Sequence, residues 1–375
     1  MATETPALTQ LPVDAIAGRA GRVDREARFP TEALVALREN GLLNAAAPGH
    51  LGGLGLSTRE LTDVAAHLAR GCGATAMVWA MHQVQLACLT RHHLDSPVLH
   101  RALAEQWLIA SVTSEAGVGG DLRTSRAAVG RPDSGVRVLE KRATTVSYGA
   151  HAQGFLVTAR RDPDAVPGDQ VAVLVERGQV RLEQTGTWDT LGMRGTCSPP
   201  FDLHMTFDGD QVLPVPFGDI AARTMVPLSH LLWSGVWTGL AAEAVHRAAR
   251  VARGRHRNGA ADANTHLAAA HARLAGIRAQ LAAAVTAAEP VLEHDKEPVL
   301  ALGVELNALK IEVSETAVDI VRLALNGCGM AGFSEQGPHS VARILRDVSS
   351  APLMIGNGRL LAANAQMLLM TRGEG

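Results

Sequence analysis

The hydrophobic pattern of this chain changes its period twice, and that change limits the folds open to it. From Val13 to about Asp121, apolar residues recur at helical spacing. Short runs bounded by Asp, Gly and Pro clusters follow, a pattern that is typical of strands. The strand-like runs are Gly135–Glu140, Gly154–Ala159, Gln170–Leu174, Gln179–Glu183 and Leu203–Phe207. Helical spacing then returns in Met225–Arg255, His266–Leu292, Val304–Leu325, Ser340–Val348 and Arg359–Met370.

We therefore predict an α+β fold with three units. Residues 1–121 are expected to form an N-terminal all-α domain, residues 122–215 a small middle β-barrel or sandwich, and residues 216–375 a C-terminal four-helix bundle. Long helical segments joined by short connections pack naturally as an antiparallel bundle. The alanine-rich faces of Ala241–Ala252 and Ala268–Ala288 favour close helix packing.

Composition narrows the class of protein. With 375 residues, 47% of them hydrophobic, the chain can bury a large core. Its formal net charge of −2 gives no general attraction to nucleic acid or to an anionic membrane. No apolar stretch reaches the roughly 20 residues of a membrane span, and the N-terminal segment lacks the apolar centre of a secretory signal. We expect a cytoplasmic protein with no nucleic-acid or membrane partner.

The spacing of cysteine and histidine predicts no metal site. The cysteines show none of the paired spacing that binds zinc or forms a disulfide framework. They are Cys72, Cys88, Cys197 and Cys328. His92 and His93 are adjacent, so they point in different directions from one helix and do not by themselves form a site.

Loop segments rich in glycine or hydroxyl groups carry the functional signal. The first runs Val112-Thr-Ser-Glu-Ala-Gly-Val-Gly-Gly-Asp121 and contains Thr113 and Ser114. Gly119 and Gly120 lack side chains and expose backbone N–H donors, so a flat ligand can approach the main chain there. The later segments are Lys141–Ala152, Thr187–Val212, Asn326–Phe333, Arg346-Asp347 and Ile355-Gly-Asn357.

Taken in order, these segments resemble the signature segments of the acyl-CoA dehydrogenase family. This flavoprotein superfamily also includes flavin-dependent monooxygenases. The order of helices, small β unit and helical bundle is also that of the family, and the resemblance extends from roughly Phe29 to Met370. It implies an oxidoreductase that binds FAD and forms a homodimer or homotetramer.

The resemblance implies which residues surround the flavin ring. Ser114 matches the flavin-contacting threonine, and Ser147 matches the threonine that bonds the flavin near the nitrogen that takes the hydride. Thr145 replaces the family's tryptophan, which removes an aromatic platform. Gly120 stands where the family has a serine that bonds the pantetheine arm of the substrate, so one expected substrate contact is missing.

The resemblance also implies contacts to the rest of the cofactor. Arg255 takes the position of an arginine that reaches the flavin diphosphate of a neighbouring subunit, and a guanidinium suits a phosphate. Asn326 and Gly329 match the loop that carries the adenosine end of FAD. Asn357 stands at the threonine of the family's Tyr-Glu-Gly-Thr segment and completes the predicted set.

The family's catalytic base is replaced. At the glutamate of that segment this chain has Ile355, which cannot accept a proton. Some family members place the carboxylate early on the first helix of the bundle, at the position of Ser229, beside His230. His230, Glu243 on the same helix and His82 are the candidates for a replacement base.

Three functions remain open. The first is FAD-dependent oxidation of an acyl thioester, carried on CoA or a carrier protein, by means of a relocated base. The second is a flavin-dependent monooxygenase that uses reduced flavin and O₂, and the absence of the glutamate favours it. The third is a catalytically inactive paralogue that binds a thioester or a partner protein. The redox functions call for an electron-transfer or flavin-reductase partner.

Overall fold

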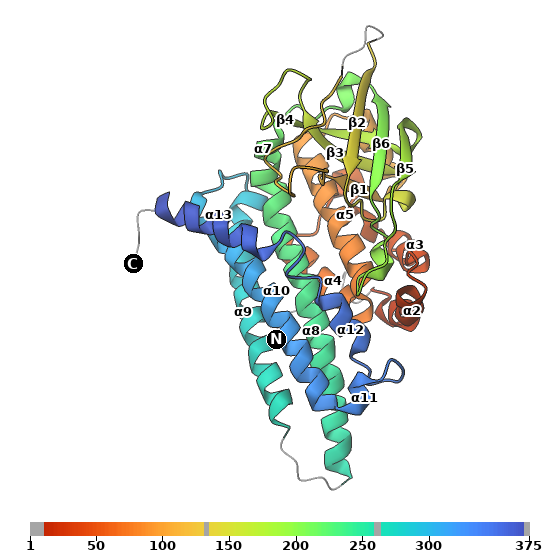
Figure 1. The fold of residues 1–375 in the computed structure, drawn as a ribbon, viewed down its shortest axis with the longest axis vertical. Helices are drawn as coiled ribbons and strands as arrows, with labels where there is room; N and C mark the ends of the chain where they lie inside the picture. Colours follow the sequence, from red (N-terminus) through yellow and green to blue (C-terminus); the bar gives the residue numbers. More distant parts are fainter. Residues whose placement is uncertain (1–10, 131–134, 259–263, 371–375) are drawn as a thin grey trace.

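The computed structural model describes residues 11–130, 135–258 and 264–370 (Figure 1). The outermost ends of the first and third predicted units lie outside this range. The N-terminal helices are α2 (Val13–Arg25), α3 (Thr31–Glu39), α4 (Thr58–Gly71), α5 (Gly73–His92) and α6 (Pro97–Ala104). Helix α4 begins at a capping box in which Ser57 and Glu60 satisfy each other's backbone N–H groups. Helix α5 is buried on almost every side, in accordance with its small and apolar sequence.

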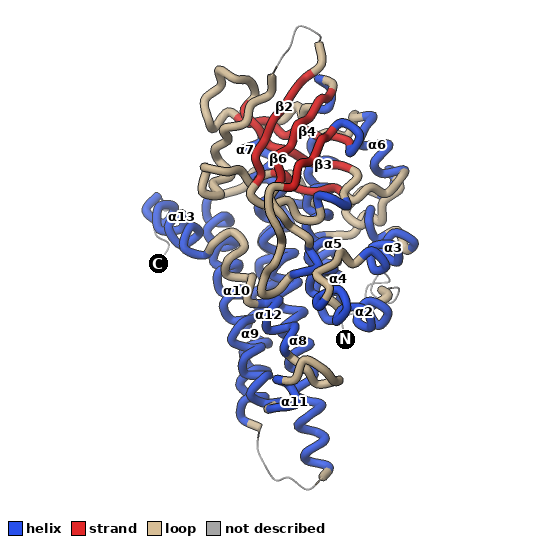
Figure 2. Tube along the Cα trace, turned by 45° about the vertical axis from the view of Figure 1, so that its right-hand side comes forward, coloured by secondary structure: helices blue, strands red, loops and turns tan. Residues whose placement is uncertain are grey.

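The middle region consists of two three-stranded sheets (Figure 2). The strands are β1 (Ile109–Val112), β2 (Arg137–Ala143), β3 (Gly154–Arg160), β4 (Gln170–Glu176), β5 (Val180–Gln184) and β6 (Phe201–Phe207). One sheet has the order β1-β3-β4 and the other β2-β6-β5. Strands β3 and β4 are buried almost throughout, whereas β6 alternates between the core and a more open face. The two alternatives predicted for this unit were a barrel and a sandwich, and the described strands form no closed barrel.

The C-terminal region is built on three long helices, α8 (Val226–Arg257), α9 (Thr265–Leu292) and α10 (Leu300–Cys328). A short helix α7 (Phe217–Ile220) and one π-helical turn lead into α8. The helix that completes the bundle against α8 and α9 is α4, from the N-terminal part of the chain. Gly235 and Gly239 allow this approach, because a Cβ at Gly235 would lie 2.8 Å from the carbonyl oxygen of Thr62 and one at Gly239 would overlap that of Ala66.

Three shorter helices follow the bundle: α11 (Met330–Phe333), α12 (Ala342–Val348) and α13 (Asn357–Met370). Helix α12 joins the bundle to the turn after β5, because Asp347 Oδ1 accepts a 2.7 Å hydrogen bond from the Met193 amide. Gly192 is needed there, since a Cβ at this position would overlap the main chain of Arg346. Helix α13 packs against α10 and extends sideways from the bundle (Figure 1).

The predicted fold class is confirmed, with one correction inside it. The segment predicted as all-α contains a strand, since β1 pairs in parallel with β3 over Ile109–Val112 and Gly154–Val157. The run Ile-Ala-Ser-Val is only four residues long, too short for its pattern to distinguish a buried strand from a helix. Over the described segments, no helix combines the length and apolar character needed to cross a membrane.

Candidate active site

A buried carboxylate fixes the glycine-rich loop that follows β1. Glu115 accepts hydrogen bonds from the Ser125 hydroxyl at 2.7 Å and from the amides of Arg126 and Ala127 at 3.0 and 2.7 Å. The ammonium of Lys141 on β2 lies 3.7 Å from Glu115 and donates to the Thr158 carbonyl at 2.6 Å. Burial lowers the pKa of Lys141 to about 8, and Glu115 opposes that shift. This ion pair therefore holds the loop against the sheet.

The structure brings the hydroxyl residues of two predicted loops together. Ser114 donates to the Thr145 carbonyl at 2.6 Å and accepts from the Thr145 amide at 3.2 Å. Ser147 accepts a hydrogen bond from Ser198 at 2.9 Å, which leaves its own O–H free to donate. The Thr145 side chain is exposed, and Thr113 contacts Ser111 at 3.4 Å. Three of the predicted ring contacts, Ser114, Thr145 and Ser147, thus lie in one connected region.

The C-terminal chain meets this region through an arginine. Arg359 on α13 donates to the carbonyl of Gly119 at 3.2 Å and also to that of Gly120. Both glycines have positive φ, 61° and 75°, a conformation that residues with side chains rarely adopt. A Cβ at Gly120 would lie 2.7 Å from the Arg359 guanidinium. Arg359 therefore occupies the space beside Gly120 that a side chain there would need.

A buried lysine holds the segment that carries the lost glutamate. Lys310 on α10 donates to the Ile355 carbonyl at 3.0 Å and to Asn357 Oδ1 at 2.6 Å, and its ammonium lies 5.6 Å from the centre of the Trp237 ring. Burial lowers the pKa of Lys310 to about 8. Asn357 also donates to Ser314 at 3.0 Å. Ile355 has φ 48°, which is unusual for a β-branched residue.

His230 on α8 ends a chain of buried amides. Asn364 donates to the Val304 carbonyl, and Asn307 donates to Asn364 Oδ1 at 2.8 Å. The Oδ1 of Asn307 is therefore free to accept, and His230 Nε2–H donates to it at 3.1 Å. Burial lowers the pKa of His230 to about 4, so the ring is neutral near pH 7. Its Nδ1 is an unprotonated acceptor without a hydrogen-bond partner in the described residues.

Other polar atoms on the same side of α8 share this property. The side chains of Trp233, Ser234 and Trp237 each carry a buried polar atom that no described residue hydrogen-bonds. With His230 they follow the spacing i, i+3, i+4 and i+7, which is one face of a helix. This face meets α10, where Lys310 lies over Trp237 and Asn307 meets His230. Buried polar atoms in native proteins are normally satisfied, so such a row is characteristic of a face that meets a polar ligand or water.

The other two candidate bases have contacts elsewhere. His82 donates from Nε2 to the Leu43 carbonyl at 2.8 Å and accepts at Nδ1 from the Ile109 amide at 3.1 Å. Burial lowers its pKa to about 4. Glu243 is bound by Arg247 at 2.8 Å. Within the described residues, neither His82 nor Glu243 forms a hydrogen bond with the hydroxyl groups of the loops.

The remaining predicted residues lie at the far end of the bundle. Arg255 donates to the carbonyls of Gly327 and Cys328 at 3.3 and 3.0 Å, and its guanidinium adjoins Gly329. Asn326 is exposed. At 1.5 Å per residue, Arg255 is about 38 Å along α8 from His230, and Figure 1 shows α11 at the opposite end of the bundle from the sheets. The predicted cofactor residues thus form two separate groups in one chain.

Several residues of the first group were not predicted from the sequence. Lys310, Arg359, Asn307 and Glu115 all hold or line the region around the loops. Lys310 carries a signal in retrospect, because it stands on the apolar face of a long helix where a lysine needs a buried partner. No group of three His, Cys, Asp or Glu side chains within the described segments is placed to hold a metal ion.

The described part of the chain combines a helical bundle, two small sheets and loops joined through their hydroxyl groups. The family models for the N-terminal and C-terminal domains of acyl-CoA dehydrogenase match residues 10–96 and 221–367. The chain belongs to the acyl-CoA dehydrogenase family, and it is a flavin-dependent oxidoreductase of that family.

Individual relatives differ in what their names describe. Amino sugar nitrososynthase DnmZ from Streptomyces peucetius is 31% identical over 88% of this chain and 84% of its own. The structure of KijD3 in complex with FMN and dTDP-3-amino-2,3,6-trideoxy-4-keto-3-methyl-D-glucose is 25% identical, with a TM-score of 0.82, and the match covers 100% of this chain and 97% of that one. Dibenzothiophene monooxygenase TdsC from Paenibacillus has the same fold, with a TM-score of 0.83 at 20% identity over 98% of each chain.

Proposed function

We propose that this protein is a flavin-dependent monooxygenase that oxygenates the amino group of an amino sugar. The observation that carries the proposal is the face of α8 that begins at His230. In a dehydrogenase of acyl thioesters this part of the scaffold must accept an apolar acyl chain and a carboxylate base. Here it offers a neutral histidine and polar atoms that have no hydrogen-bond partner in the described part of the chain. Such a face suits a substrate with hydroxyl and amino groups.

The absence of a base at position 355 supports the same reading. Lys310 fixes the Ile355 carbonyl, so the main chain of this segment is held while its side chain supplies no acid or base. Removal of an α-proton from a thioester depends on a base that contributes roughly 10²–10⁴-fold. Oxygenation of an amine does not use that proton. The nitrososynthase relative acts, by its name, on an amino sugar.

We assign the positioning of the amine to His230. Its Nδ1 is an acceptor, so it would take a hydrogen bond from the amino group and direct the nitrogen lone pair away from the ring. The low pKa keeps Nδ1 unprotonated at neutral pH. The amide chain through Asn307 and Asn364 fixes the tautomer that leaves Nδ1 open.

The residues present fit a flavin ring at the hydroxyl loops. Ser147 keeps a free O–H donor, and a Cβ at Gly119 would meet no heavy atom within 4 Å, so the main chain is open to a flat group there. A bound reduced flavin would supply the electrons that activate O₂. Amine, O₂ and reduced flavin then give the hydroxylamine, water and oxidised flavin, and a second round gives the nitroso compound and two waters. A flavin reductase is the partner that this balance calls for.

For the cofactor we propose FMN in place of the FAD expected from the sequence. The adenosine half of FAD would depend on Asn326 and Arg255, but Asn326 is exposed and Arg255 already donates to two main-chain carbonyls. The KijD3 structure, 25% identical to this chain, was solved with FMN. Extraction of the bound flavin and chromatography against FMN and FAD standards will decide between the two.

If FAD is bound instead, the second group would belong to the site of a neighbouring subunit. Arg255 lies about 38 Å along α8 from His230, so the two groups do not adjoin within one chain. Exposed Met330 and Phe333, with 78% and 66% of their surface accessible, follow Gly329 and would be covered by such a contact. Sedimentation analysis with and without FAD tests this, because FAD would then stabilise the dimer.

The decisive experiment supplies the purified protein with flavin, a flavin reductase, O₂ and a nucleotide-linked amino sugar. Mass spectrometry should show a product that has gained one oxygen atom, or one oxygen with loss of two hydrogens. His230→Gln should lower kcat by roughly 10²-fold with flavin binding unchanged. His67→Gln, at a half-buried histidine on α4, is the matched control. Anaerobic bleaching of the flavin by an acyl thioester, without oxygenation of the amine, would favour the dehydrogenase, and no flavin binding would favour the inactive paralogue.

A further inference from the structure

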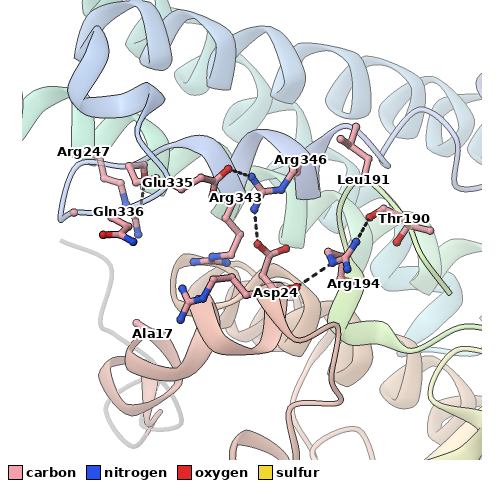
Figure 3. A pocket seen from close by; sticks show the side chains of 14 residues that line it. Ala17, Asp24, Thr190, Leu191, Arg194, Arg247, Glu335, Gln336, Arg343 and Arg346 are labelled. Carbon is pink, nitrogen blue, oxygen red and sulfur yellow. Dashed lines mark hydrogen bonds and ion pairs between the residues drawn. The ribbon is translucent and has the colours of Figure 1, made fainter.

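A cavity of about 650 Å³ is lined by none of the residues of the candidate active site. Figure 3 shows it between α2, the turn before β6 and the segment from α11 to α12. Its volume is within the range of small-molecule sites. Five arginines line it: Arg25, Arg194, Arg247, Arg343 and Arg346. The only carboxylates among the lining residues are Asp24 and Glu335.

Two of these arginines have unused donors. Arg343 Nη1 lies 3.5 Å from Asp347 but makes no hydrogen bond within the described residues, although its side chain is only 15% exposed. Arg25 on α2 forms no ion pair with any residue of the described segments. Arg194 and Arg247 are anchored from outside the cavity by carboxylates at 2.9 and 2.8 Å. Their positions are thereby fixed, which favours recognition of an anion.

One carboxylate that lines the cavity already binds one of its arginines. Glu335 is 63% exposed, yet its carboxylate reaches back to the guanidinium of Arg346 (Figure 3). Arg346 also binds Asp24, whose side chain is 8% exposed. The second oxygen of Asp24, Oδ1, is buried and accepts no hydrogen bond from the described residues. A ligand in this cavity would therefore meet several guanidinium donors and one open acceptor.

We propose that this cavity binds a phosphate ester that carries hydroxyl groups, as sugar phosphates and nucleotides do. Guanidinium groups bind phosphate oxygens through paired, charge-assisted hydrogen bonds. The phosphate displaces Glu335 from Arg346 and engages Arg25 and Arg343. A hydroxyl of the ligand donates to Asp24 Oδ1. The turn Arg194–Thr196 links this site to the loops, since Arg194 lines the cavity and Thr196 hydrogen-bonds Ser198, the partner of Ser147.

The test is calorimetric titration of the full-length protein with inorganic phosphate and with ribose 5-phosphate at low salt. Ribose 5-phosphate should bind more tightly than phosphate, since only it has hydroxyls for Asp24. Arg25→Gln should weaken its binding roughly tenfold, as expected for a lost hydrogen bond to a charged group. Glu335→Gln should tighten binding, because the competing carboxylate is removed. The opposite signs of these two effects distinguish a site from general surface charge.

Arg22→Gln is the matched control, because Arg22 lies on the same helix, pairs with Glu26 and does not line the cavity. It should leave the affinity within about twofold of the unaltered protein, a difference of less than 0.5 kcal/mol. Trp188 gives a local signal, since its ring nitrogen donates to the Met193 carbonyl across the turn that forms one wall. The proposal is overturned if ribose 5-phosphate binds no better than phosphate, if Arg25→Gln has no effect, or if Arg22→Gln weakens binding equally. A nucleoside diphosphate in a third titration shows whether a base adds affinity.

Discussion

The ion pair of Glu115 and Lys141 gives the sharpest test of how the glycine-rich loop is held. Both side chains are buried, with 6% and 0% of their surface exposed. Glu115 fixes the loop through two amides and a hydroxyl, and Lys141 stands on β2 of the other sheet. We consider Glu115→Gln, Lys141→Met and the double variant. Each single change leaves one buried group without its charge partner.

The expected magnitudes follow from burial. Breaking one side of a buried ion pair typically costs about 3–5 kcal/mol, since the remaining charge loses its compensation. Glu115→Gln falls at the lower end because the amide oxygen still accepts hydrogen bonds from the main chain. Lys141→Met also abandons the Thr158 carbonyl that the ammonium binds at 2.6 Å. In the double variant no charge stays buried, so its loss should be at least about 2 kcal/mol smaller than the sum of the single losses.

Urea unfolding at pH 7, followed by circular dichroism, measures the three losses. Binding of flavin to the same variants measures whether the loop still presents Ser114. We expect flavin affinity to fall in Glu115→Gln. Ser114→Ala leaves the ion pair intact and should cost no more than about 1.5 kcal/mol of stability, for its lost hydrogen bonds to the exposed Thr145. The reasoning is refuted if each single loss is below about 1 kcal/mol or if the double loss equals the sum, because the pair would then contribute no more than a surface pair.

Three further outcomes are expected. Gly239→Val should destabilise the protein by more than about 2 kcal/mol in urea unfolding, because the new side chain has to displace the main chain of Ala66 on α4; Gly254→Val, where a Cβ meets nothing within 4 Å, is the control for helix propensity. The folded-state pKa of Lys310, about 8, is below its unfolded value of about 10.4, so the unfolded state binds more protons between these pH values. The stabilising contribution of Lys310 should therefore rise with pH across this window and be absent below it. Lys310→Met should flatten this rise in the free energy of unfolding, and an unaltered dependence on pH would contradict the assignment. Ile355→Glu should not create thioester-dependent flavin bleaching, since the polar face of α8 does not suit an acyl chain, and bleaching in stopped-flow absorbance would restore the dehydrogenase.

Local signals predicted most of the fold. The period change located the strands β3, β4, β5 and β6 to within a few residues, and the long helices α8, α9 and α10 were each predicted. The role of α4 could not be predicted in this way. Its place in the bundle depends on Gly235 and Gly239, and a helical pattern does not show which partner a small residue admits. The strand β1 was likewise hidden, because its pairing with β3 is a contact between segments distant in the chain.

The candidate site also combines contacts that the sequence predicted with contacts that depend on packing. Ser114, Thr145 and Ser147 were predicted together, and the structure joins them. The network that leaves His230 with an open Nδ1 was not predictable, because it depends on the orientation of amides on α10 and α13. A sequence shows which groups can donate or accept, but only the packed structure shows which of them are already used.

The contacts of the segment around Ile355 explain how the fold keeps its geometry here without the family's glutamate. Lys310 binds the main-chain carbonyl of residue 355, so this contact is independent of the side chain. A β-branched residue at φ 48° carries strain of order 1–3 kcal/mol, which surrounding contacts must offset. Those contacts continue through Asn357 to α13, where Arg359 binds the glycine-rich loop. The segment therefore still positions the loop that would face the flavin, and a chain can exchange the base for an apolar residue while it keeps the geometry that a flavin reaction needs.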